Sequence, residues 1–159
     1  MVSLEGDGEP EMLLETSFDE HTPKVSPDDQ WLAYVTDESG RDEIYLRRFP
    51  TGGKWQISTE GGKEPMWSRD GRELFYRNGE KMMAVDVSAG ADSAGKPTLL
   101  FEGPYDLKIG AGATNYDVTP DGQGFVMIRS PDSQESAGIT QITLVLNWFE
   151  ELKRLAPTN

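Results

Sequence analysis

Cysteine is absent from this 159-residue chain, and histidine occurs once, as His21. Without cysteine there can be no disulfide, no thiolate metal site and no cysteine nucleophile. The chain also has no G-x-S-x-G segment and no H-E-x-x-H segment, so the single histidine has no serine triad or zinc-protease helix to join. We therefore expect no catalytic residue, no metal site and no cofactor, and we interpret His21 as a loop or channel-mouth residue.

Positive charge is also scarce, because 15 Lys and Arg stand against 28 Asp and Glu, for a net charge of −13. Phosphate binding requires a basic surface, so we exclude nucleic acid and an anionic membrane surface as partners. No segment approaches the roughly 18 apolar residues of a membrane span, and residues 1–11 do not have the pattern of a signal peptide. A protein or peptide partner remains, and acidity favours a basic one. Solubility alone is the other explanation of the acidity.

A repeat organises the chain, which is long enough for one domain with a buried core. Each copy has Ser or Thr, one intervening residue, Asp and a turn residue, and then a strand-forming run. Ser26 and Ser68 lie 42 positions apart, and Ser68 and Thr119 lie 51 apart. A period in the low forties is typical of β-propeller blades. The Asp-Gly or Asp-Asp pair supplies the positive φ of a tight turn, to which the hydroxyl can add hydrogen bonds.

Runs rich in β-branched and aromatic residues follow each turn and divide the single module, residues 1–159, into blades. We predict blade 1 over 22–59 and blade 2 over 63–102 with four strands each, and blade 3 over 114–146 with three. An orphan outer strand over 10–16 would supply the missing strand of blade 3. The predicted fold class is all-β: a propeller half-ring of three four-stranded antiparallel blades.

A short C-terminal α-helix is predicted over residues 147–156. Asn147 is a good N-cap, and Glu150 three residues later completes a capping box. The apolar face of this helix consists of Trp148, Leu152 and Leu155. Such a face would cover an open sheet edge or dock on a partner.

The stretch from Ser26 to Asp121 resembles the PD40 (WD40-like) repeats of TolB-like β-propellers. The residues that carry the resemblance are Ser26-Pro27-Asp28 with Trp31-Leu32-Ala33-Tyr34, Ile57-Ser58-Thr59-Glu60-Gly61-Gly62 with Pro65-Met66-Trp67-Ser68-Arg69-Asp70-Gly71, Glu73-Leu74-Phe75-Tyr76, and Tyr116-Asp117-Val118-Thr119-Pro120-Asp121-Gly122. The segment Leu146–Leu152 is similar to the C-terminus of propellers fused to bacterial serine/threonine kinases. The resemblance implies a propeller fold. A piece of a TolB-like or kinase-type parent would be periplasmic or extracytoplasmic, and the sequence alone leaves the compartment open.

Such propellers usually have six or more blades, and three blades cannot close a ring. Open sheet edges would remain at both ends of the half-ring, and exposed edges favour aggregation. Either the chain is a piece of a larger protein, or two copies pair head-to-tail into a six-bladed ring. We expect the homodimer.

Propellers gather variable loops on one face, where a rigid frame presents them to a partner. The loops that lead into the innermost strands carry His21, Lys63, Asn115 and Tyr116, and an adjacent hairpin tip carries Asp37 and Asp42. We predict these six residues as the partner-binding face of a non-catalytic binding or scaffold module. Two alternatives remain: a sensor or spacer domain of a kinase-type parent, and a hydrolase or lyase that uses axial carboxylates. Sequence spacing selects no carboxylate pair for the second alternative.

Two other motifs do not support a ligand site. Gly90–Pro97 almost matches the phosphate-binding segment G-x-x-x-x-G-K-[ST], but Pro97 has no hydroxyl and a strand rather than a helix is expected after it. The acidic hairpin tip around Gly40 does not have the spacing of a calcium-binding EF-hand loop.

Overall fold

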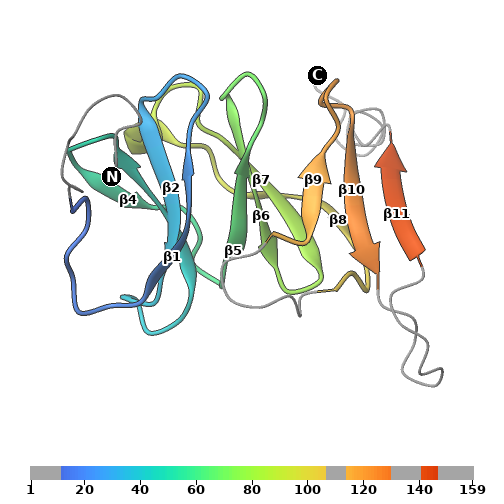
Figure 1. Ribbon diagram of the computed structural model, residues 1–159, viewed down its shortest axis with the longest axis horizontal. Coiled ribbons are helices and arrows are strands. Elements are labelled where there is room, and N and C mark those ends of the chain that lie inside the picture. The colour runs from blue at the N-terminus through green and yellow to red at the C-terminus, as the bar shows by residue number, and fades with distance from the viewer. Residues whose placement is uncertain (1–11, 107–113, 130–140, 147–159) are drawn as a thin grey trace, which may run out of the picture.

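Three antiparallel sheets stand side by side in the computed structural model, which describes residues 12–106, 114–129 and the backbone of 141–146 (Figure 1). The first sheet, blade 1, consists of β1 (Glu20–Val25), β2 (Trp31–Thr36), β3 (Glu43–Arg48) and β4 (Lys54–Gln56). Blade 2 consists of β5 (Lys63–Trp67), β6 (Glu73–Asn78), β7 (Lys81–Asp86) and β8 (Thr98–Glu102), with the short 3-10 helix η1 (Ala91–Ser93) before β8. Blade 3 consists of β9 (Tyr116–Val118), β10 (Gly124–Arg129) and β11 (Gln141–Leu146).

The all-β class and the two four-stranded antiparallel blades are confirmed, whereas the predicted orphan strand is corrected. Residues 12–16, the described part of the segment 10–16, form no strand. They lie beside blade 1, where the Leu13 carbonyl oxygen accepts a hydrogen bond from Arg47 Nη1 at 2.6 Å. The predicted helix over 147–156 lies outside the described residues. No helix among the described residues is long and apolar enough to cross a membrane.

The repeated turn has the same hydrogen bonds in all three blades. In blade 2, Ser68 Oγ donates to Asp70 Oδ1 at 2.8 Å and accepts the Glu73 N–H at 2.9 Å. Asp70 Oδ1 also accepts the Arg72 N–H at 3.1 Å. The same three bonds join Ser26, Asp28, Gln30 and Trp31 in blade 1, and Thr119, Asp121, Gln123 and Gly124 in blade 3.

These bonds explain both the charge and the glycine of the turn. The serine or threonine hydroxyl stabilises the ionised carboxylate and so lowers the pKa of Asp28, Asp70 and Asp121. The residue after each aspartate has a positive φ: 71° at Gly71, 69° at Gly122 and 57° at Asp29. Glycine adopts this conformation without strain, and aspartate tolerates it better than most residues do.

Strand alternation gives each blade two apolar faces. We call the face toward the preceding blade the near face and the face toward the following blade the far face. In β2, Leu32 and Tyr34 lie on the near face, and Ala33 and Val35 lie on the far face. The alternation follows from the two-residue period of a strand.

Two seams between blades make up most of the core. In the first seam, the far face of blade 1 packs on the near face of blade 2, and in the second, the far face of blade 2 packs on the near face of blade 3. The first seam contains Ala33, Val35, Ile44 and Leu46 against Leu74, Tyr76 and Val85. The second contains Phe75, Met82 and Ala84 against Tyr116, Phe125 and Met127. Phe75 and Phe125 meet edge to face there, with ring centroids 5.0 Å apart.

Polar contacts also join neighbouring blades at the end where the repeated turns lie. The indole Nε1 of Trp67 donates to the Lys24 carbonyl oxygen at 2.9 Å, which joins the innermost strands of blades 1 and 2. The guanidinium Nη1 of Arg69 donates to the Pro120 carbonyl oxygen at 2.9 Å, which joins the turns of blades 2 and 3. The blades therefore form one arc in which both faces of blade 2 are covered by its neighbours.

The turn network generates the first prediction. Ser68→Ala removes two hydrogen bonds from one turn and leaves the Glu73 N–H without its acceptor, so we expect the free energy of unfolding to fall by about 1–2 kcal/mol. Urea denaturation followed by tryptophan fluorescence measures the change. Ser93→Ala, which removes an exposed hydroxyl, is the control and should be neutral. Equal midpoints for Ser68→Ala and the native chain would contradict a stabilising role of the turn.

Candidate functional site

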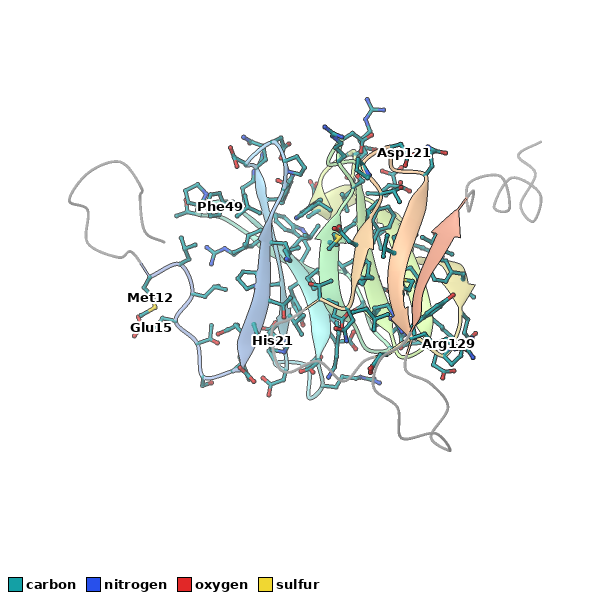
Figure 2. The ribbon with its side chains drawn as sticks, turned by 45° about the vertical axis from the view of Figure 1, so that its right-hand side comes forward. Met12, Glu15, His21, Phe49, Asp121 and Arg129 are labelled. Atoms are coloured by element: carbon teal, nitrogen blue, oxygen red, sulfur yellow. The ribbon has the colours of Figure 1, made fainter. Side chains whose placement is uncertain are left out.

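The two ends of the blades differ in what they carry (Figure 2). His21 and Arg129 lie at one end, and Phe49 and Asp121 lie at the opposite end, where the repeated turns are. We call the first end the loop face. It is made by the chain that leads into β1, β5 and β9 and by the hairpin tips 37–42 and 79–80.

Equivalent positions of the repeat meet at the loop face. Thr22, Glu64 and Asn115 each precede the turn hydroxyl residue by four positions, and all three are buried. The strand is irregular here, because β1 and β5 have register shifts and because Thr22 and Glu64 have φ of 54° and 55°. Positive φ in non-glycine residues is strained, and strain of this kind clusters at functional sites. His21, Lys63 and Thr114 come one position earlier in each repeat.

Asp42 brings together the predicted residues of two blades. Its Oδ2 lies 2.8 Å from Lys63 Nζ, and its Oδ1 lies 3.9 Å from His21 Nε2. The Asp42 carbonyl oxygen also accepts the Gly62 N–H at 2.9 Å. The hairpin tip of blade 1 is thus tied to the chain that leads into blade 2, and three of the six predicted residues form one group.

The other predicted acidic residue, Asp37, lies at the same end but outside this group. Its Oδ1 accepts the backbone N–H of Asp19 at 3.0 Å, and the side chain is exposed. It is therefore available to a partner as an acceptor of charge-assisted hydrogen bonds.

A buried carboxylate holds the linker between blades 1 and 2 beneath these residues. Glu43 is 1% exposed, accepts a hydrogen bond from Ser58 Oγ, and accepts the Gly61 N–H at 2.9 Å. Ser58 Oγ in turn accepts the Ile44 N–H at 2.8 Å. A Cβ at Gly62 would lie 2.5 Å from Ser58 Oγ, so only glycine allows this close approach. The linker therefore places the backbone of Lys63 beside the hairpin tip that carries Asp42.

Asn115 and Tyr116 are directed inward rather than toward a partner. Tyr116 Oη donates to the Glu64 carbonyl oxygen at 2.7 Å, and the Asn115 N–H donates to Glu64 Oε2 at 3.1 Å. The two residues are 1% and 5% exposed. They join blade 3 to the innermost strand of blade 2 and support the loop face from below.

Glu64 was not among the predicted residues, although it lies at the centre of this group. Burial raises the pKa of Glu64 and holds the pKa of Tyr116 well above its usual range. Arg77, which is 1% exposed and has its pKa lowered by burial, interacts electrostatically with the same carboxylate. The repeat could have revealed Glu64, since it occupies the position of Thr22 and Asn115.

A cavity of about 410 Å³ opens on the loop face between blades 1 and 2. Its lining includes Asp42, Lys63 and Arg77, together with the glycines 61, 62 and 79. The described residues contain no group of three or more His, Cys, Asp or Glu side chains that could hold a metal ion. The arrangement is suited to binding, with charged groups of both signs at the rim and a supporting layer of buried polar residues below.

The seam contact of Tyr116 generates the second prediction. Tyr116→Phe leaves the buried Glu64 carbonyl oxygen without its donor, so the free energy of unfolding should fall by about 1–2 kcal/mol. Thermal or urea unfolding followed by circular dichroism measures the loss. Tyr105→Phe, at a half-buried position without such a contact among the described residues, is the control. An identical effect of the two substitutions would show that the Tyr116 bond contributes nothing.

Neither the comparison with family models nor the comparison with curated proteins gives a match. Solved structures do match. The chain superposes on an oligogalacturonate lyase from Vibrio parahaemolyticus with a TM-score of 0.55 and 21% identity, over 73% of this chain and 31% of that one. An oligogalacturonate lyase in complex with manganese gives a TM-score of 0.53 and 18% identity, over 70% and 31% of the two chains.

TolB from Acinetobacter baumannii matches with a TM-score of 0.51 and 18% identity, over 87% of this chain and 45% of that one. The chain spans less than half the length of each of these structures. At such identities the likeness concerns the fold, and it gives no support to a kinase-type parent. The three blades, their repeated turns and these matches show that the chain has the TolB-like β-propeller fold.

Proposed function

We propose that this chain is a non-catalytic propeller module that binds a basic protein or peptide partner through its loop face. The observation that carries the proposal is the group of His21, Asp42 and Lys63, which lies next to the buried hydrogen bonds of Glu43 and Glu64. A rigid support below exposed polar groups is what a binding surface needs, because less conformational entropy is lost when the partner docks.

Charge favours a basic partner. The hairpin tip and adjoining loops carry Asp19, Asp37, Glu38, Asp42, Glu60 and Glu80, and the chain as a whole has a net charge of −13. A net negative field accelerates association with a positively charged partner and disfavours association with a negatively charged one. The same field repels nucleic acid and anionic membranes.

The proposal includes a second copy of the chain as a partner. Three blades form an arc, and two arcs arranged head-to-tail would make a six-bladed ring with a complete loop face. The three solved structures described above are each more than twice as long as the part of them that this chain covers. Ring closure would bring His21, Lys63 and Thr114 of both copies around one axis.

A labelled octa-arginine peptide tests the basic-partner proposal. The double variant Asp37→Asn/Asp42→Asn should weaken its binding about fivefold, since each exposed charge pair contributes on the order of 0.5 kcal/mol. Fluorescence anisotropy measures the affinity. The control Asp29→Asn/Asp92→Asn removes the same charge from the opposite end of the blades and should have a smaller effect.

Stopped-flow kinetics on the same peptide tests the charge mechanism. The association rate should fall steeply as salt rises from about 0.05 M to 0.5 M, because salt screens exposed charges. Two results would contradict the proposal: equal losses in both double variants, or an association rate that salt does not change.

A second candidate function rests on Glu64. It is a buried carboxylate with a raised pKa, a strained backbone and a favourable electrostatic interaction with the Arg77 guanidinium, which are features of catalytic carboxylates. Two of the matched structures are oligogalacturonate lyases, one of them in complex with manganese. The described residues, however, offer no cluster that fits manganese.

Incubation with oligogalacturonate separates the two candidates. We expect no unsaturated product in the ultraviolet spectrum, with or without added manganese, because a single buried carboxylate lacks the partner acid or base of an elimination. Product that forms with the native chain and is lost in Glu64→Gln would instead establish the lyase function. Circular dichroism of Glu64→Gln serves as the folding control.

A further inference from the structure

The repeat makes the near-face positions of the two seams of the chain equivalent. Positions 32 and 34 of blade 1 correspond to 74 and 76 of blade 2 and to 125 and 127 of blade 3. These are the near-face residues, and in the second and third blades each pair is buried against the blade before it. A near face in this fold is therefore a surface on which another blade docks.

The far faces follow the same rule. Ala33 and Val35 of blade 1 and Phe75 of blade 2 pack on the next blade. Their equivalents in blade 3 are Val126 and Ile128, which remain half-buried. Within the described residues, the near face of blade 1 and the far face of blade 3 are thus the two faces without a blade against them.

The near face of blade 1 has a cover of a different kind. Leu32, Tyr34 and Tyr45 form a buried cluster there, and Leu14 and Phe49 pack against it. Burial raises the pKa of the Tyr34 phenol to about 12. We call residues 12–16 the strap. It forms no strand, and Met12 at its start is 72% exposed.

The strap leaves polar and apolar groups of this face without the contacts that a neighbouring blade makes in the seams. Arg47 Nη1 donates to the Leu13 carbonyl oxygen at 2.6 Å, but the buried Arg47 Nε has no hydrogen-bond partner among the described residues. Beside the strap, the end of β1 leaves Val25 42% exposed. In blade 2, the equivalent residue is Trp67, which is buried and bonded to Lys24 of blade 1.

We propose that the near face of blade 1 is the docking surface for blade 3 of a second copy, and that the strap competes with that copy for the face. The inference rests on the proposed self-association and adds its interface and its regulation. Repeat equivalence identifies the occupant, because Val126 and Ile128 hold the positions that already pack on near faces inside the chain. Head-to-tail contacts of this type give a closed ring when repeated rotation from one copy to the next returns to the first copy.

Sedimentation velocity of strap variants tests the competition. Leu14→Asp removes the apolar anchor of the strap, so the dimer dissociation constant should fall about tenfold as the face becomes free. Met12→Asp adds the same charge two residues away at an exposed position and should leave the constant unchanged. An unchanged or larger constant for Leu14→Asp, with native circular dichroism, would overturn the competition.

Complementation tests the interface itself. Val25→Asp places a charge on the near face of blade 1, and Val126→Asp places one on the far face of blade 3, so neither variant should associate with itself. An equimolar mixture should form a 1:1 dimer, because the far face of the first and the near face of the second are intact. Leu99→Asp, at an exposed apolar site outside the seams, should associate as the native chain does.

Two results would overturn the interface: undiminished self-association of either single variant, or a mixture that stays monomeric although both variants are folded. Octa-arginine binding concerns the loop face of single copies, so its outcome is independent of the test of the interface between copies. A native chain that binds octa-arginine but stays monomeric would refute self-association and this inference, and leave the basic-partner proposal intact. A native chain that dimerises but does not bind the peptide would refute the basic-partner proposal alone.

Discussion

The packing of one blade against the next is the interaction on which the rest of this structure depends. Because strands alternate apolar residues to both sides, neither face of a blade can be left in water without exposing residues such as Leu74 or Phe75, which are buried in the seams. Each blade therefore requires a neighbour. The same requirement explains the inward direction of Tyr116, the strap over Tyr34 and the exposure of Val25 at the end of the arc.

Much of the fold was predictable because short segments of the sequence encode it and because these segments repeat. The Ser-x-Asp turn and its strand-forming run recur with one set of hydrogen bonds, so the alignment of Ser26, Ser68 and Thr119 located the innermost strands and the hairpins correctly. The orphan strand failed for a physical reason. Residues 12–16 have strand-like composition, but they meet the flat side of blade 1 through Leu14 instead of pairing along a sheet edge.

The site was predicted less completely, because burial and pairing depend on contacts between blades. Loop position placed His21, Asp42 and Lys63 at one end of the blades, but it could not show that Asp42 bridges the other two. Nor could it distinguish exposed Asp37 from buried Asn115. Glu64 was missed since it looks like one more surface acid in a chain with 28 of them. Only the equivalence with Thr22 and Asn115 distinguishes it.

The central claim is that blade 3 of one copy packs on blade 1 of another in the same way as neighbouring blades pack within one chain. Cross-linking tests this claim most directly. Inside the chain, Lys24 of blade 1 meets Trp67 of blade 2, and the repeat maps this contact onto Asp117 of one copy and Val25 of another. The chain has no cysteine, so Val25→Cys and Asp117→Cys each introduce a single reactive thiol. A short bismaleimide should cross-link the mixture of the two variants into dimers and leave each variant alone as monomer. Absence of cross-linked dimers in the mixture, or equal cross-linking of each variant with itself, would contradict the account.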